Sequence, residues 1–119
     1  MSIFPKELYD KKIEYHINRI HDKEDFERAV SREDILFYHF VLDISLDHYL
    51  QLLFTLNRCY FPSRKKNIEF IDGFSIKPFD VGNRILKIIE LGGKKDAIKE
   101  SYEMWKKLCK DIEEIKNTL

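Results

Sequence analysis

The feature that most constrains the fold is a long apolar segment that begins near Ile35 and ends before Pro62. Its hydrophobic residues recur with the spacing of a helix that is buried on most of its circumference. The pattern predicts a helix of roughly 28 residues that extends to about Phe61. Ser31 and Asp34 resemble a capping box at its start. Pro62 cannot donate the backbone hydrogen bond of a helix interior and should prevent continuation.

Shorter segments on either side also show helical periodicity or helix boundaries. They cover residues 5–20, 22–30, 63–71, 77–93 and 94–116. The chain contains only four glycines and three prolines, which leaves little turn chemistry for a sheet of many strands. The sequence therefore predicts an all-α fold in which residues 1–119 form a single domain. We expect an antiparallel helical bundle of four to five main helices with short connections.

Composition limits the classes of partner and site. The chain has 21 basic and 21 acidic residues, so its net charge offers no reason to expect nucleic acid or an anionic membrane as partner. The long apolar segment is interrupted by polar residues and should not span a membrane. Cys59 and Cys109 are far apart and form no metal-binding motif, and we expect both to be small buried side chains. Two unpaired thiols and no signal peptide favour a cytoplasmic location.

Polar residues recur every four positions along the long helix. They are His39, Asp43, Asp47, Gln51 and Thr55. This stripe is either the solvated edge of a bundle helix or the wall of a cleft that faces a ligand. Asp43 and Asp47 lie one turn apart and should repel each other unless a positive group lies between them. No second carboxylate-rich helix is present to complete a di-metal site, so no metal site is expected here.

The histidines suggest one alternative function. Arg32 and His39 match the loose Arg-x4–6-His pattern of HEPN-type helical ribonucleases, in which both side chains face a phosphodiester from one helix. Arg32 should lie in the first turn of the long helix, and this alternative needs both side chains to converge in an open groove, paired across a dimer. His16 and His21 have no partner at ligand spacing, and we expect both at the surface.

The end of the long helix carries an unusual set of polar side chains, in "LNRCYFPSRKKN". Between Asn57 and Arg84 the chain has six basic residues against three acidic ones. The negative end of a helix attracts cations and explains part of this excess. It does not explain an amide, a guanidinium and a phenol in succession, which suit contacts with a polar ligand. A purely structural role, with Asn57 capping the helix, remains the rival interpretation.

The same region resembles a known family. "LFTLNRCYFPSRKK", followed by "GFSIKPFDVGNRILKIIELGG", is similar to the C-terminal helical domain of nucleotidyltransferases related to the aminoglycoside (kanamycin) type. The shared features are the motif at the end of the central helix, the proline after the aromatic pair and the final Gly-Gly. The resemblance extends from the first predicted helix to the last.

The resemblance implies a substrate-binding or accessory role without catalysis. The catalytic half of those enzymes uses a Gly-Ser turn and an Asp-x-Asp pair to bind Mg²⁺ and a nucleoside triphosphate, and "GFS" at residues 73–75 is not followed by such a pair. We therefore expect no cofactor on this chain alone and a nucleotidyltransferase catalytic domain as partner, in the same longer chain or as a separate subunit. A homodimer or a purely structural helix-packing module are alternatives.

The matching positions give the expected contact residues. For the substrate or partner they are Asn57, Arg58, Tyr60 and Lys65. Asp43 and Asp47, on the same long helix, would also suit contact with a cationic or hydroxyl-rich acceptor. The resemblance implies that Arg58 or Lys65 meets a phosphorylated group. Asn57 and Tyr60 would contact the acceptor or hold the loop. One face near residues 40–66 should then be exposed and partly apolar when the chain is alone.

Overall fold

The fold is all-α, as the sequence predicts. A computed structural model describes residues 4–119, and within them it contains six helices and no strand. They are α1 (Lys6–Ile17), α2 (Lys23–Ser31), α3 (Ile35–Leu56), α4 (Asn67–Asp72), α5 (Val81–Leu91) and α6 (Ile98–Thr118). The count exceeds the expected four to five main helices, because the bundle also includes the six-residue α4.

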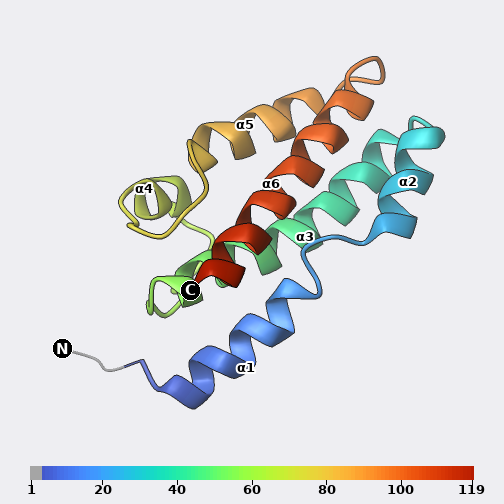
Figure 1. Cartoon of the computed structure of the whole chain (residues 1–119). Helices are drawn as coiled ribbons and strands as arrows, with labels where there is room; N and C mark the ends of the chain where they lie inside the picture. Colours follow the sequence, from blue (N-terminus) through green and yellow to red (C-terminus); the bar gives the residue numbers. More distant parts are fainter. Residues whose placement is uncertain (1–3) are drawn as a thin grey trace.

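Helix α3 is the central element of the bundle. It packs against α1, α2 and α4, while α5 packs against α6, and α2 also reaches α6 (Figure 1). The twelve buried residues of α3 lie on several sides of the helix, in agreement with the apolar pattern that predicted its burial. Neighbouring helices therefore contact α3 on more than one side and fix its position in the fold.

The core between α3 and α6 is built around Trp105. This side chain is fully buried, and its indole N–H donates to the backbone oxygen of Ile20, 3.1 Å away, at the turn between α1 and α2. The Tyr49 ring lies 5.1 Å from the Trp105 ring, and the Tyr49 hydroxyl donates to the backbone oxygen of Leu108 at 2.9 Å. The buried polar atoms of both aromatic side chains are thereby satisfied.

A second buried hydrogen-bond chain joins three helices. The hydroxyl groups of Tyr38 on α3 and Ser101 on α6 are 2.7 Å apart. Ser101 Oγ also donates to the backbone oxygen of Ile88 on α5, at 2.6 Å. Because Ser101 donates there, the Tyr38 hydroxyl is the donor between the two hydroxyls. This series of hydrogen bonds fixes the relative register of α3, α5 and α6.

The bounds of α3 differ from those expected. The helix has 22 residues and ends at Leu56, five residues before Phe61. Arg58 adopts a left-handed conformation, with φ of 56°, which turns the backbone out of the helix before Pro62 is reached. At the other end Asp34 is the N-cap and accepts a hydrogen bond from the backbone N–H of Phe37, whereas Ser31 is the last residue of α2. The expected capping box is therefore wrong.

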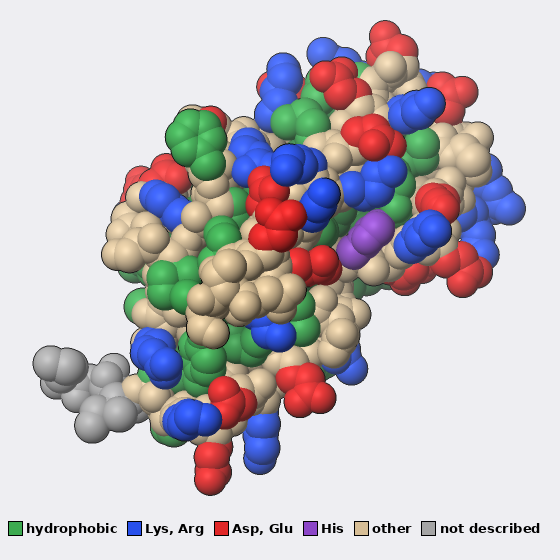
Figure 2. Space-filling model, in the orientation of Figure 1, with side chains coloured by type: hydrophobic (Ala, Val, Ile, Leu, Met, Phe, Trp, Pro, Cys, Tyr) green, Lys and Arg blue, Asp and Glu red, His purple; other side chains and the backbone are tan. Residues whose placement is uncertain are grey.

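The surface carries both signs of charge. On the face in Figure 2, acidic and basic side chains are interleaved over most of the area shown, with hydrophobic side chains between them. Among residues 4–119, no helix is both long enough and apolar enough to cross a membrane.

Candidate functional site

The first half of α3 exposes an apolar stripe. Leu36, Phe40 and Ile44 follow one another at intervals of four residues, so they lie on the same side of the helix. Their exposed fractions are 85%, 60% and 47%. Large apolar side chains that gather at the surface in this way are typical of an interaction site. Part of the face expected near residues 40–66 is thus exposed and apolar, and the exposed stripe also extends beyond it to Leu36.

The two carboxylates of the polar stripe are bridged by a cation. Arg64, in the loop after α3, places its guanidinium 3.0 Å from Asp43 Oδ1 and 3.6 Å from Asp47 Oδ1. The other oxygen of Asp47 accepts a hydrogen bond from Gln51. The positive group that the spacing of these carboxylates requires is therefore a residue of this chain.

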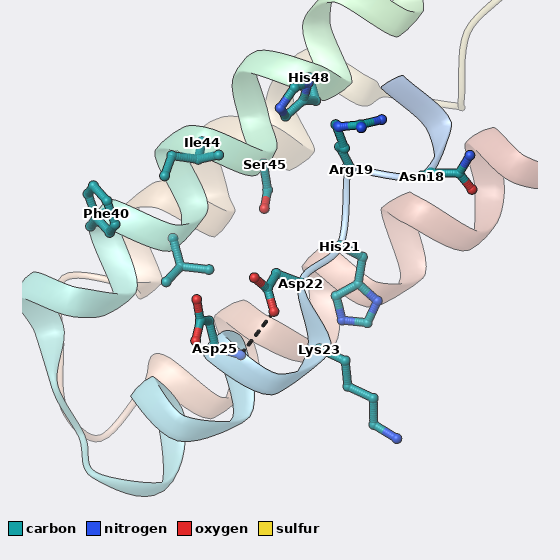
Figure 3. A pocket seen from close by; sticks show the side chains of 11 residues that line it. Asn18, Arg19, His21, Asp22, Lys23, Asp25, Phe40, Ile44, Ser45 and His48 are labelled. Carbon is teal, nitrogen blue, oxygen red and sulfur yellow. Dashed lines mark hydrogen bonds between the residues drawn. The ribbon is translucent and has the colours of Figure 1, made fainter. Parts of the chain in front are cut away.

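A cavity of about 430 Å³ lies between α3 and the segment from Asn18 to Asp25. Figure 3 shows the Ser45 hydroxyl directed into it, with the Asp22 and Asp25 carboxylates on the opposite side. Ser45 is 1% exposed, and Asp22 caps α2 by accepting a hydrogen bond from the backbone N–H of Asp25. Phe40 and Ile44 also line the cavity, which places it beside the apolar stripe.

His16 and His48 form a pair between α1 and α3. Their Nδ1 atoms are 3.0 Å apart, so one imidazole donates and the other accepts. His16 is buried, which corrects its expected place at the surface. Burial, together with the nearby His48 and Lys12, lowers the pKa of His16 from 6.5 to about 4. Burial also lowers the pKa of His48. Both imidazoles are neutral at pH 7.

His21 also has a partner in the fold. Its Nε2 atom is 2.7 Å from the Tyr102 hydroxyl on α6, and its side chain is partly buried. His21 therefore lies at the surface only in part, because its side chain is partly buried. The contact joins the turn between α1 and α2 to the last helix.

Arg32 and His39 do not lie on one helix. Arg32 is the C-cap of α2, whereas His39 lies within α3. Two residues between these helices, Glu33 with φ of 50° and the N-cap Asp34, change the chain direction. Arg32 is therefore not in the first turn of the long helix, and the separation of seven residues does not put the two side chains on one helical face.

Asn57 clamps the end of α3 to a later loop. Its Nδ2 group donates to the backbone oxygens of Leu53, at 2.9 Å, and Ile76, at 2.7 Å. Its Oδ1 atom accepts from the backbone N–H of Ile76 at 3.0 Å. Both amide protons and the amide oxygen of Asn57 are therefore engaged within the chain, which agrees with the structural interpretation of Asn57 as a cap.

The other residues of the motif spread around the helix end. The Arg58 guanidinium lies 4.3 Å from the centre of the Tyr9 ring on α1. The Tyr60 ring lies 4.7 Å from that of Phe4 and remains half exposed. Lys65 is exposed. Arg58 and Tyr60 therefore contact the N-terminal part of the chain, while Asp43 and Asp47 lie with Arg64.

The cysteines occupy different environments. Both thiols are free, and Cys109 is buried as expected, but Cys59 is exposed in the loop after α3. Burial raises the pKa of the Cys109 thiol, which favours its neutral, unreactive form. Among residues 4–119, no group of three or more His, Cys, Asp or Glu side chains could hold a metal ion.

Some features of the site escaped sequence reasoning. The apolar stripe had a signal, because Leu36, Phe40 and Ile44 recur every four residues, but periodicity does not reveal which side of a central helix lacks a neighbour. No sequence signal indicated the pairing of His16 with His48, because 32 positions separate them.

Comparison with known proteins gives one match. No curated protein and no solved structure gives a significant match. A family model described as a domain of unknown function (DUF4037) matches residues 1–66, more than half of the 119-residue chain. The matched segment includes α1, α2, α3 and Arg64. The description of this family names no activity, so the nucleotidyltransferase resemblance stays a prediction. The chain belongs to the DUF4037 family.

Proposed function

We propose that this chain is a non-catalytic helical domain that binds substrate for, or otherwise assists, a nucleotidyltransferase catalytic domain. The partner lies in the same longer chain or in a separate subunit. The observation that supports the proposal is the exposed apolar stripe of Leu36, Phe40 and Ile44, with a cavity beside it. A catalytic domain that packs on this stripe would bury apolar surface and enclose the cavity.

The charges near the stripe suit this role. Asp43 and Asp47 lie on α3 with one cation, Arg64, between them. Their side chains are partly exposed, so they remain accessible to a partner or an acceptor. Lys65 is exposed in the same loop and is available to a phosphorylated group. Mg²⁺ and the nucleoside triphosphate would be bound by the partner, because this chain lacks the Asp-x-Asp pair. The two free thiols favour a reducing cytoplasmic compartment.

The test is an affinity capture of the tagged chain from the source organism, read by intact-mass and peptide mass spectrometry. We expect near-stoichiometric recovery of a protein that carries the Gly-Ser…Asp-x-Asp signature, or a longer polypeptide that contains both parts. A variant with Phe40→Ser and Ile44→Ser should lose a separate partner, because it removes the apolar contact without altering the core. Phe79→Ser is the matched control, since Phe79 is 88% exposed in the loop before α5.

Two outcomes would contradict the proposal. One is recovery of the 119-residue chain alone, as monomer or dimer. The other is equal loss of the captured partner with Phe79→Ser and with the Phe40/Ile44 variant. In a third outcome, a partner binds while the Lys65→Ala variant leaves the partner's nucleotidyl transfer activity unchanged. In that case this chain contributes helix packing and not substrate contact.

A further inference from the structure

His16 and His48 bring two imidazole nitrogen atoms together between α1 and α3. His16 Nδ1 and His48 Nδ1 approach each other to 3.0 Å from two different helices. The ring centres are 5.2 Å apart and the ring planes are inclined by 47°. The rings are thus not stacked, and the two nitrogen atoms, rather than the ring faces, make the closest approach.

The distance between these nitrogen atoms suits two ligands of one metal ion. Imidazole nitrogen atoms bind Zn²⁺ and related ions at about 2.0–2.1 Å. Two such bonds to atoms 3.0 Å apart enclose an angle of about 95° at the ion. This value is close to the right angle between neighbouring ligands in square-planar and octahedral complexes, the geometries of Cu²⁺ and Ni²⁺ sites.

A cavity beside the pair is open to solvent, and an oxygen donor lies nearby. The lining of a cavity of about 560 Å³ contains both histidines and also Lys11, Lys12, Tyr15, Asp47 and Gln51. Asp47 precedes His48 on α3, and its two carboxylate oxygens are held by Gln51 at 2.9 Å and by Arg64 at 3.6 Å. An ion could therefore enter with water ligands, which would complete a coordination sphere to which the chain contributes two nitrogen atoms.

The surroundings orient the histidines. The Tyr15 ring stacks on His16 with a centre distance of 5.0 Å and an interplanar angle of 3°, and the Arg19 guanidinium lies 3.9 Å from the centre of the Tyr15 ring. In the hydrogen-bonded pair one Nδ1 atom carries a proton, so metal binding requires this proton to leave or to move to Nε2 of the same ring. Lys12 and Arg19 oppose a cation here, and Asp47 favours one.

We infer that His16 and His48 are the protein ligands of a divalent transition-metal site, selective for Cu²⁺, Ni²⁺ or Zn²⁺ over Mg²⁺ and Ca²⁺. The selectivity follows from the nitrogen ligands, because Mg²⁺ and Ca²⁺ prefer oxygen. A bound ion replaces the hydrogen bond between the imidazoles and joins α1 to α3. The inference does not depend on the proposed nucleotidyltransferase partner, because the chain alone supplies both nitrogen atoms.

The experiment titrates the metal-free chain with Ni²⁺, Zn²⁺ and Mg²⁺ by isothermal calorimetry at pH 7.5. The ¹⁵N resonances of the histidine rings are followed in parallel by NMR. We expect one saturable site for Ni²⁺ or Zn²⁺ and none for Mg²⁺, with the Nδ1 resonances of His16 and His48 shifted. His48→Gln should weaken binding by about tenfold or more, because one of the two protein ligands is lost.

His39→Gln is the matched control, since it removes an imidazole from the same helix outside the pair. It should leave the affinity unchanged. His16→Gln tests the second ligand, and circular dichroism checks that this buried substitution leaves the fold intact. The inference is overturned if Ni²⁺ and Zn²⁺ bind no better than Mg²⁺. His16 and His48 would then be a hydrogen-bonded pair without a role in metal binding. It is also overturned if folded His48→Gln protein keeps the wild-type affinity.

Discussion

The guanidinium of Arg64 lies between the carboxylates of Asp43 and Asp47 and binds the loop after α3 back onto that helix. The contact offsets the repulsion of two acids one turn apart. All three side chains are partly exposed, so solvent weakens the pairs. The bridge therefore contributes modestly to stability and mainly determines the position of the loop.

The bridge leads to a prediction about stability. Arg64→Met should lower the free energy of unfolding by no more than about 1 kcal/mol, because exposed ion pairs are weak. Lys65→Met, at the exposed neighbouring position, should change it by less. Urea denaturation at low and high salt would measure both, and the Arg64 effect should shrink as salt screens the charges. An Arg64 effect that does not depend on salt would contradict this account.

The clamp made by Asn57 should be more important for stability. Asn57→Ala removes three hydrogen bonds and leaves the backbone N–H of Ile76 without this partner, so we expect a loss of about 2–3 kcal/mol. Asn83→Ala is the matched control, because Asn83 is exposed and donates one bond to Asp80. Equal midpoints of denaturation for the two variants would show that the clamp is dispensable.

The turn between α5 and α6 offers a test with adjacent glycines. A Cβ atom on Gly92 would lie 2.7 Å from Cε2 of Tyr38, a fully buried ring whose hydroxyl is held by Ser101. Gly92→Ala should therefore destabilise the protein by about 1–3 kcal/mol. Gly93→Ala meets only an ordinary contact, 3.5 Å from the backbone oxygen of Glu90, and should change stability by less than about 0.5 kcal/mol. Thermal unfolding of the two variants would separate these expectations.

The buried histidine should make stability depend on pH. The pKa of His16 is lowered from 6.5 to about 4 in the folded chain, so the unfolded chain binds the proton more readily. The contribution of neutral His16 is complete above about pH 7 and is lost as the pH falls from about 6.5 towards 4. The lost stability could reach about 3 kcal/mol.

Urea denaturation at pH 7.5, 5.5 and 4.5 would measure this dependence. Carboxylates also titrate near the lower end, so the informative quantity is the difference between wild type and variant. His16→Gln should show a flatter decrease between pH 6.5 and 4.5, whereas His39→Gln should follow the wild type. Parallel curves for wild type and His16→Gln would contradict the assigned role of His16.

The sequence by itself determined the fold class and most of the helices. The periodicity of apolar residues is a local property, and it located α1, α2, α5 and α6 to within a few residues. Gly92 was correctly expected at the end of α5, where it is the C-cap. The repulsion between Asp43 and Asp47 also required a nearby cation, although the sequence did not show that the cation would be Arg64.

Only the tertiary structure decided which side chains meet. The end of α3 depends on the left-handed turn at Arg58 and on hydrogen bonds between Asn57 and Ile76, 19 positions later, rather than on Pro62. The pairing of His16 with His48 depends on how α1 packs on α3. Exposure of Phe40 likewise depends on which side of α3 its neighbours leave uncovered. Helical periodicity gives the face of each residue on its own helix, whereas contacts between helices arise only when those faces pack together.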